Sequence, residues 1–133
     1  MNKRYRSIIK KKEEKIKESK TKWQIYVENA PYGVFIVDKS GKYLDVNPMA
    51  CKITEYTKEE LLNMSIPDLL PLESFEFAEK HFNKLINESY SYGELIYKTK
   101  TGKLRWWSVS AQKISDNRSI GFCEDITKRK EAE

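Results

Sequence analysis

The side chains that most often perform chemistry are scarce in this sequence of 133 residues, which contains one histidine, His81, and two cysteines, Cys51 and Cys123. A serine or cysteine nucleophile paired with a histidine base would have to use His81. No group of Cys and His residues has the spacing of a zinc site, and the five glycines form no phosphate-binding loop. We therefore expect a binding or interaction domain, with no enzymatic activity in this segment.

The two cysteines are expected to be reduced and separate. Cys51 lies beside Met49 and Ile53 in a predicted short helix, and Cys123 lies in the last predicted strand, so both are interpreted as small core residues. The basic N-terminus lacks the apolar core of a secretory signal, and no apolar run approaches the roughly 20 residues of a membrane span. These observations predict a cytoplasmic protein with free thiols.

The net charge of +5 is concentrated at the start of the chain. Residues 1–22 hold ten Lys and Arg residues against three Glu, whereas the remaining residues hold fifteen against seventeen Asp and Glu. A nucleic-acid-binding surface is normally basic on the folded domain itself. Here only the N-terminal arm is basic, so we expect no nucleic-acid partner.

The arm, residues 3–29, contains no Pro or Gly and predicts a helix. Ile9, Ile16 and Trp23 recur every seven residues, and Tyr26 belongs to a second, half-polar seam of the same helix. Two interpretations stay open: a dimerising coiled-coil seam, or a solvated helix whose C-terminal end packs on the domain. A helix lying on a membrane surface is disfavoured because the apolar face is narrow.

The rest of the sequence contains strand and helix patterns. Turn residues and period-two alternation predict five strands, at residues 33–38, 42–46, 92–98, 103–114 and 118–125. Capping signals and apolar spacing predict short helices at 48–53 and 60–63, a turn at 65–68 and a longer amphipathic helix at 73–87. Strands grouped at both ends with helices between them imply an α+β fold, in which helices cover one face of a single antiparallel sheet.

His81 belongs to the longer amphipathic helix. The apolar face of that helix is formed by Phe75, Ala78, Phe82 and Leu85, and His81 lies off this stripe beside lysines. We therefore interpret His81 as an exposed or half-exposed surface residue.

Residues 24–130 resemble a PAS domain of the sensory-box type. The motifs that carry the resemblance are residues 28–33 (ENAPYG), 37–41 (VDKSG), 46–48 (VNP), 56–61 (YTKEEL), 100–102 (KTG) before Trp106, and 125–130 (DITKRK). Each motif alone is weakly specific, but their order and spacing over most of the chain make the match strong. The resemblance implies a five-stranded antiparallel sheet in the order 2-1-5-4-3 with helices over its concave face. It also implies a sensory role, usually within a histidine kinase or another multidomain signalling protein.

The resemblance raises the question of a cofactor, because some PAS domains hold a flavin or a haem. The photoactive cysteine of flavin-binding relatives would fall near residues 65–70, which contain no Cys. Haem-binding relatives use a His of the longer helix, but the family register places that ligand nearer residues 76–78 than His81. We expect no tightly bound cofactor, with flavin or haem kept as the alternative.

The resemblance also implies a ligand pocket on the concave face. Adjacent strand residues point to opposite faces, so Trp107 is expected to face the pocket and Trp106 the outer face, against the arm. Trp107 either fills the pocket or stacks on a planar ligand, and filling is favoured because an indole leaves less room for a cofactor. The pocket candidates are Ile36, Met49, Ile53, Phe82, Leu95, Tyr97, Trp107, Val109 and Phe122. The residues expected in dimer or arm contacts are Ile9, Ile16, Trp23, Tyr26 and Trp106.

The motif at residues 125–127 predicts how a signal would leave the domain. Thr127 is predicted to N-cap a helix that begins at Lys128, and Asp125 to anchor the end of the last strand. By resemblance, Asp125, Ile126 and Thr127 would connect the sheet to an output helix. The sequence ends as this helix begins, so we expect a segment of a longer protein.

Three parts are thus predicted: a helical arm at residues 1–29, a PAS domain at 30–127 and the start of an output or linker helix at 128–133. The expected function is a sensory and dimerisation module, a homodimer that relays ligand or partner binding to other domains of a signalling chain. The alternatives are a flavin- or haem-containing redox, gas or light sensor, and a cofactor-free PAS domain that serves only protein–protein contact.

Overall fold

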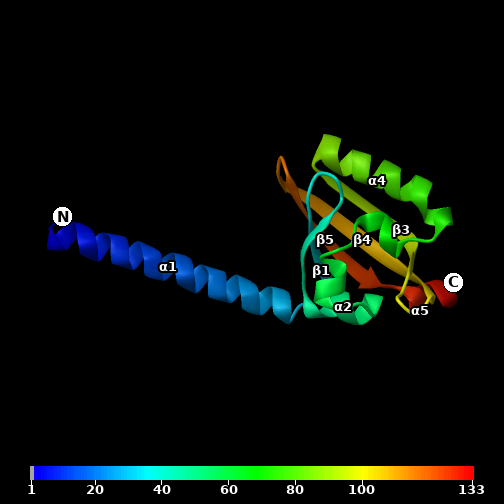
Figure 1. Cartoon of the computed structure of the whole chain (residues 1–133), viewed down its shortest axis with the longest axis horizontal. Coiled ribbons are helices and arrows are strands. Elements are labelled where there is room, and N and C mark those ends of the chain that lie inside the picture. Colours follow the sequence, from blue (N-terminus) through cyan, green and yellow to red (C-terminus); the bar gives the residue numbers. More distant parts are fainter. Residues whose placement is uncertain (1) are drawn as a thin grey trace.

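A five-stranded antiparallel sheet forms the centre of the protein, and the computed structural model describes residues 2–133 (Figure 1). The strands lie in the order β2-β1-β5-β4-β3, and every neighbouring pair is antiparallel. This confirms the predicted α+β fold and the implied strand order. The elements follow the chain as α1 (Lys3–Glu28), β1 (Gly33–Val37), β2 (Tyr43–Val46), α2 (Pro48–Thr54), α3 (Lys58–Leu61), the 3-10 helices η1 (Ile66–Leu69) and η2 (Leu72–Ser74), α4 (Phe75–Glu88), β3 (Tyr90–Lys98), β4 (Leu104–Ser115), β5 (Arg118–Asp125) and α5 (Thr127–Glu131).

The helix boundaries follow local capping. The side chain of Asn47 accepts a hydrogen bond from the Ala50 amide at 3.0 Å and starts α2, with Pro48 at its first position. Thr57 and Glu60 form the predicted capping box, but α3 begins at Lys58, two residues before the predicted start. The longer helix, α4, begins two residues after its predicted start because residues 72–74 form η2.

The two faces of the sheet differ in what covers them. Phe35 and Val37 of β1, Leu95 and Tyr97 of β3, and Trp107 of β4 are buried in the core beneath the helical segment. In Figure 1, α4 lies across the sheet on this side. The outer face carries half-buried and exposed residues, as expected for an antiparallel sheet that faces water on one side.

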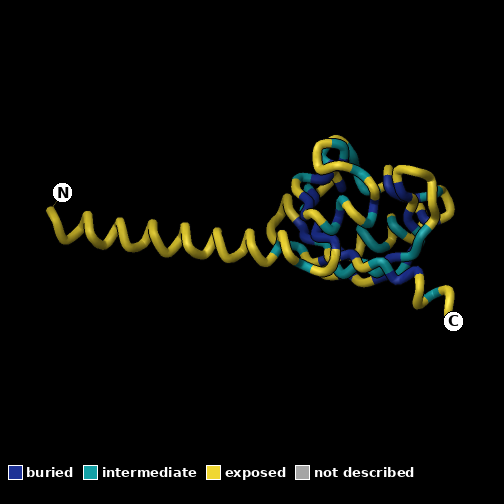
Figure 2. The backbone as a smooth tube through the Cα atoms, turned by 90° about the horizontal axis from the view of Figure 1, so that it is seen from below, coloured by how far each residue is buried: buried dark blue, intermediate teal, exposed yellow. Residues whose placement is uncertain are grey.

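The arm helix α1 projects away from the domain as a continuous rod (Figure 1). None of its residues is buried, and the trace of α1 is exposed along almost its whole length in Figure 2. Its C-terminal end is attached through Asn47, whose side-chain amide donates to the carbonyls of Val27, at 2.8 Å, and Tyr32, at 3.0 Å. Across residues 2–133, no helix combines the length and the apolar character needed to cross a membrane.

Candidate functional site

An apolar cavity of about 70 Å³ lies between α4, η1 and the covered face of the sheet. Phe82 and Leu85 of α4 form one side, and Leu95, Trp107 and Val109 of β3 and β4 form the other. The remaining lining residues come from β1, β2, η1 and the residue after it, α4, β4 and β5, and they are Phe35, Val37, Tyr43, Ile66, Leu70, Ala78, His81, Ala111, Ser119, Ile120, Gly121 and Cys123. The lining contains no Asp, Glu, Lys or Arg, so the cavity suits an uncharged occupant.

Trp107 lines this cavity and is 3% exposed. Its indole stacks on the ring of Tyr97, with centroids 4.1 Å apart and an interplanar angle of 18°, and meets Phe35 edge-on at 5.8 Å. One indole face is therefore occupied by protein. The buried Nε1 donor of Trp107 has no hydrogen-bond partner within residues 2–133.

Seven of the nine predicted pocket residues fall into three groups. Phe82, Leu95, Trp107 and Val109 line the cavity. Tyr97 is fully buried behind Trp107, outside the lining. The two candidates on α2, Met49 and Ile53, also lie outside the lining, although Ile53 packs against the core.

The assignment of Ile36 and Phe122 to the pocket is wrong. In the strand pairing Val109 lies opposite Cys123, and Phe35 lies opposite Gly121. Directly paired residues of antiparallel strands share a face, so Cys123 points to the cavity side and its neighbour Phe122 points outward. Phe122 is 36% exposed and packs edge-on against Tyr32 of the outer face, and Ile36 has the same parity as Phe122.

His81 makes more contacts within the fold than the predicted surface residue would. It lines the cavity, and its ring nitrogens lie 3.1 and 3.3 Å from the hydroxyl of the buried Ser91 on β3. Gly93 makes this position accessible, because a Cβ there would lie 3.0 Å from Cδ2 of His81. Burial lowers the pKa of His81, which a backbone hydrogen bond at Val109 partly offsets and the charge of Lys84 reinforces.

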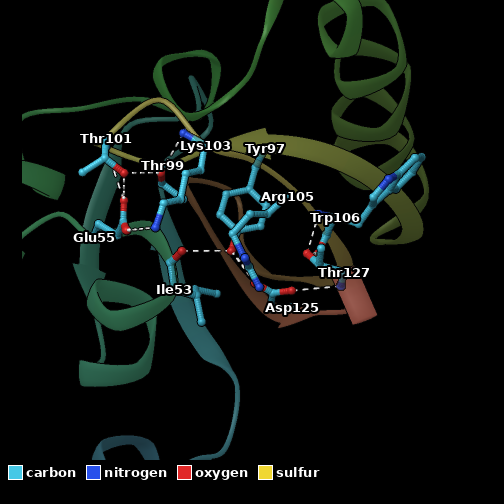
Figure 3. Close-up of polar contacts among 10 residues, drawn as sticks. All are labelled: Ile53, Glu55, Tyr97, Thr99, Thr101, Lys103, Arg105, Trp106, Asp125 and Thr127. Carbon is cyan, nitrogen blue, oxygen red and sulfur yellow. Dashed lines mark hydrogen bonds and ion pairs between the residues drawn. The ribbon is translucent and has the colours of Figure 1, made fainter. Parts of the chain in front are cut away.

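Asp125 joins the end of β5 to several elements (Figure 3). Its Oδ2 lies 2.9 Å from the hydroxyl of Tyr97 and accepts a hydrogen bond from Nε of Arg105, and its Oδ1 accepts from the amide of Thr127 at 2.9 Å. The Tyr97 hydroxyl also lies 2.9 Å from the carbonyl of Ile53 in α2. Burial alone would raise the pKa of Asp125, but the hydrogen bonds from Arg105, Thr127 and Tyr97 outweigh it and lower the pKa to about 2.

The predicted N-cap role of Thr127 is wrong. The helix α5 begins at Thr127, one residue before the predicted start, so the N-cap position falls on Ile126, which makes no side-chain cap hydrogen bond. The Thr127 hydroxyl instead accepts a hydrogen bond from the amide of Trp106 in β4 at 3.0 Å, while Asp125 accepts one from the Thr127 amide. The capping carboxylate therefore comes from the strand and not from the helix itself.

Trp106 is covered by α5 and not by the arm. Nζ of Lys130 lies 4.8 Å from the centroid of the Trp106 ring, and Glu94 of β3 pairs with both Lys130, at 2.9 Å, and Arg129. The hydrogen bonds from Lys130 and Arg129 lower the pKa of Glu94 to about 2. This outer-face contact corrects the prediction that the arm covers Trp106. The other predicted arm residues, Ile9, Ile16, Trp23 and Tyr26, are exposed.

Several residues of the site were missing from the sequence-based prediction. Cys123 faces the cavity, where Phe122 was expected. The pairing of Cys123 with Val109 is the feature that identifies it. Asn47 was recognised only as a helix cap, although its side chain also bonds Val34, Val27 and Tyr32. Glu94 carried no recognisable signal, because its partners lie on a helix 35 residues later.

The comparisons with known proteins agree with this architecture. The family model described as the PAS fold matches residues 21–126. The chain is 26% identical over 123 residues to the sensor histidine kinase TmoS of Ectopseudomonas mendocina, covering 86% of this chain and 12% of that protein. It is 29% identical over 122 residues to the methyl sulfide methyltransferase-associated sensor of Methanosarcina acetivorans, covering 89% of this chain and again 12% of the relative.

Solved structures show the same fold. A domain of a sensory box sensor histidine kinase/response regulator from Geobacter sulfurreducens superposes with a TM-score of 0.73 and 26% identity, over 80% of this chain and 94% of that chain. An RNA-binding light-oxygen-voltage receptor shares the fold with a TM-score of 0.73 at 15% identity, over 82% of this chain and 33% of that chain. With the family match extending over most of its length, this chain belongs to the PAS family.

Proposed function

We propose that this PAS domain is a sensory module in which the apolar cavity receives a small molecule and α5 carries the response to a following domain. The observation that supports it best is a continuous series of contacts from the cavity to α5. Trp107 lines the cavity and stacks on Tyr97, the Tyr97 hydroxyl bonds Asp125, and Asp125 receives the first amide of α5. A change in Trp107 packing would thus alter the contacts that hold α5.

The mechanism is a shift between two populations of α5, one held by Asp125 and Glu94 and one released. A ligand shifts such an equilibrium only as far as it prefers one state, so it must contact a group that differs between the two states. Trp107 meets this requirement, because it lines the cavity and stacks on the residue that bonds Asp125.

The receiving domain is proposed to be a histidine kinase. The chain spans 12% of the length of two curated relatives, which are named as a sensor histidine kinase and a methyltransferase-associated sensor. The arm at residues 1–29, the PAS domain at 30–127 and the linker at 128–133 would then be consecutive parts of a longer signalling protein. Its cytoplasmic location stays a prediction.

Self-association through α1 is part of the proposal. Ile9, Ile16 and Trp23 are 41%, 56% and 55% exposed at seven-residue spacing on one helix. A row of exposed apolar side chains is stabilised when it packs against a second helix and leaves water. A parallel partner would also bring two output helices together. The solvated-helix alternative predicts a monomer.

A tightly bound flavin or haem is not part of the proposal. The cavity of about 70 Å³ is small compared with the roughly 300–1,000 Å³ typical of cofactor and drug-sized ligand sites, and His81 is already bonded to Ser91. The buried Trp107 favours one other function, a PAS domain whose pocket is filled by its own side chains and which serves only protein contact.

Extraction of the purified 133-residue chain tests the proposal. Small molecules released by denaturation are identified by gas chromatography and mass spectrometry in the wild type, in Ala78→Leu and in Asn83→Leu. Ala78 lines the cavity, whereas Asn83 is exposed on the same helix and serves as the matched control. We expect a small neutral compound in the wild type and in Asn83→Leu that is lost in Ala78→Leu. Identical extracts from all three proteins would favour the purely protein-binding function.

A further inference from the structure

Trp107 lines the cavity, and its indole N–H is the one buried side-chain nitrogen or oxygen without a hydrogen-bond partner within residues 2–133. An indole nitrogen donates a single hydrogen bond and accepts none. Leaving such a donor buried without a partner is costly, and the cost is recovered by any occupant that brings an acceptor atom. The cavity lining itself supplies no such acceptor to Nε1.

The rest of the lining excludes charged ligands. Its titratable side chains are Tyr43, His81 and Cys123, and burial raises the pKa of Tyr43 and Cys123 and lowers that of His81. All three are therefore neutral near pH 7. A carboxylate, phosphate or ammonium group would enter this cavity without a counter-charge, at a high desolvation cost.

A surface groove lies next to the cavity, beside η1. A groove of about 320 Å³ between η1, α4 and the turn at Gly41 shares four apolar side chains with the cavity, namely Ile66, Leu70, Ala78 and Phe82. These four side chains therefore border both the groove and the cavity. The only acidic or basic residue of the groove is Glu79, an acidic residue that disfavours anions there.

We propose that the cavity selects a small, uncharged molecule that carries one acceptor oxygen, such as a ketone, aldehyde or ether, and that Trp107 Nε1 donates a hydrogen bond to this oxygen. This inference rests on the proposed function, because it names the ligand class of the same cavity. The apolar lining accepts the hydrocarbon part of the molecule, and the volume of about 70 Å³ limits the ligand to a few non-hydrogen atoms.

Acetone and isobutylene form a matched pair of probes, since they have the same shape and differ in a carbonyl oxygen against a methylene group. Both are titrated into the full 133-residue chain and followed in ¹H–¹⁵N spectra. The amides of Leu95 and Val109 report occupancy of the cavity, and the indole signals of Trp106 and Trp107 report the hydrogen bond. Acetone is expected to move the Trp107 indole proton downfield and saturably, without moving that of Trp106. Isobutylene should shift Leu95 and Val109 without a downfield shift of the Trp107 indole proton.

The variant Trp107→Phe removes the N–H and keeps an aromatic ring against Tyr97. The ratio of acetone affinity to isobutylene affinity should fall by about tenfold in this variant, the typical value of one hydrogen bond. The wild-type indole shift tests the inference independently of how well the variant folds. Binding of both probes with an unmoved Trp107 indole proton, or with an unchanged affinity ratio, would overturn the ligand class and leave the sensory cavity intact. If neither probe shifts the amide signals of Leu95 and Val109, the proposed function would be overturned as well.

Discussion

The ring of Tyr97 stacks on the indole of Trp107 at a centroid distance of 4.1 Å, so the wall of the cavity and the residue that bonds Asp125 are in direct contact. Tyr97 is fully buried, and burial together with the nearby Asp125 carboxylate raises the pKa of its hydroxyl far above neutrality. The hydroxyl therefore stays protonated and can donate to Asp125. This stacked pair connects the two functional parts of the domain.

The first prediction concerns the adjacent tryptophans. Trp107→Ala should lower the free energy of unfolding by about 3–5 kcal/mol, because it removes a buried indole between Tyr97 and Phe35. Trp106→Ala is the matched control, since Trp106 lies half-buried on the outer face beside Lys130, and its cost should be about 1 kcal/mol. Urea denaturation of both variants gives the comparison. Equal losses would show that the two faces are not distinguished as described.

The second prediction concerns Asn47, which is 2% exposed and bonds four backbone groups. Asn47→Ala leaves the amides of Val34 and Ala50 without their partner and should cost about 2–4 kcal/mol in urea denaturation. Asn63→Ala, at an exposed residue with one local hydrogen bond, should change stability by less than about 0.5 kcal/mol. A cost for Asn47→Ala as small as that of the control would refute the structural role of this side chain.

The third prediction is a pH dependence that originates at His81. Because burial lowers the pKa of His81 in the folded protein, the unfolded chain binds a proton first as the pH falls. The contribution of neutral His81 is fully present above the unfolded pKa of about 6.5 and declines below it. Stability should therefore fall as the pH drops below about 6.5, and His81→Phe should flatten that part of the curve. Denaturant midpoints at several pH values measure it, and parallel curves for the two proteins would contradict the prediction.

The fourth prediction concerns the attachment of α5. Glu94→Gln keeps the shape of the side chain and removes the charge that pairs with Arg129 and Lys130. Hydrogen exchange at the amides of Lys130 and Ala132 should accelerate, and added salt should accelerate it in the wild type by screening the same pairs. Glu124→Gln is the control, because Glu124 is an exposed outer-face carboxylate without an ion pair within residues 2–133. Unchanged exchange in Glu94→Gln would show that these pairs do not hold α5.

The sequence predicted those parts of the site that depend on local periodicity. Trp106 and Trp107 were assigned to opposite faces because strand residues alternate, and the structure places them so. Phe122 was misplaced because Phe122 and Cys123 are both apolar, and only the pairing of Cys123 with Val109 decides which faces the helices. The role of Thr127 was wrong for a similar reason, since both Asp125 and Thr127 can cap and the position of β4 decides between them.

His81 and Glu94 could not be assigned from the sequence because their contacts are made between distant segments. A helical wheel places His81 off the apolar stripe, but the absence of a side chain at Gly93 lets α4 approach β3 and brings His81 to the cavity. Glu94 occupies an ordinary outward strand position, and its function depends on where α5 packs. Periodicity identifies faces, whereas the approach of two segments is a property of the fold.

The most direct test of the coupling between cavity and α5 is hydrogen exchange at the amides of Ile126 and Thr127, which bond Trp106 and Asp125. The cavity is filled by Ala78→Leu, with Asn83→Leu as the surface control, in the wild type and in Tyr97→Phe. Tyr97→Phe keeps the ring stacked on Trp107 and removes the bond to Asp125. We expect Ala78→Leu to slow exchange at both amides in the wild-type background and to have no such effect when Tyr97 is Phe. Signal transfer through Trp107, Tyr97 and Asp125 would be contradicted by either of two results. One is that Ala78→Leu leaves the exchange rates of Ile126 and Thr127 unchanged. The other is that it changes them equally with and without the Tyr97 hydroxyl.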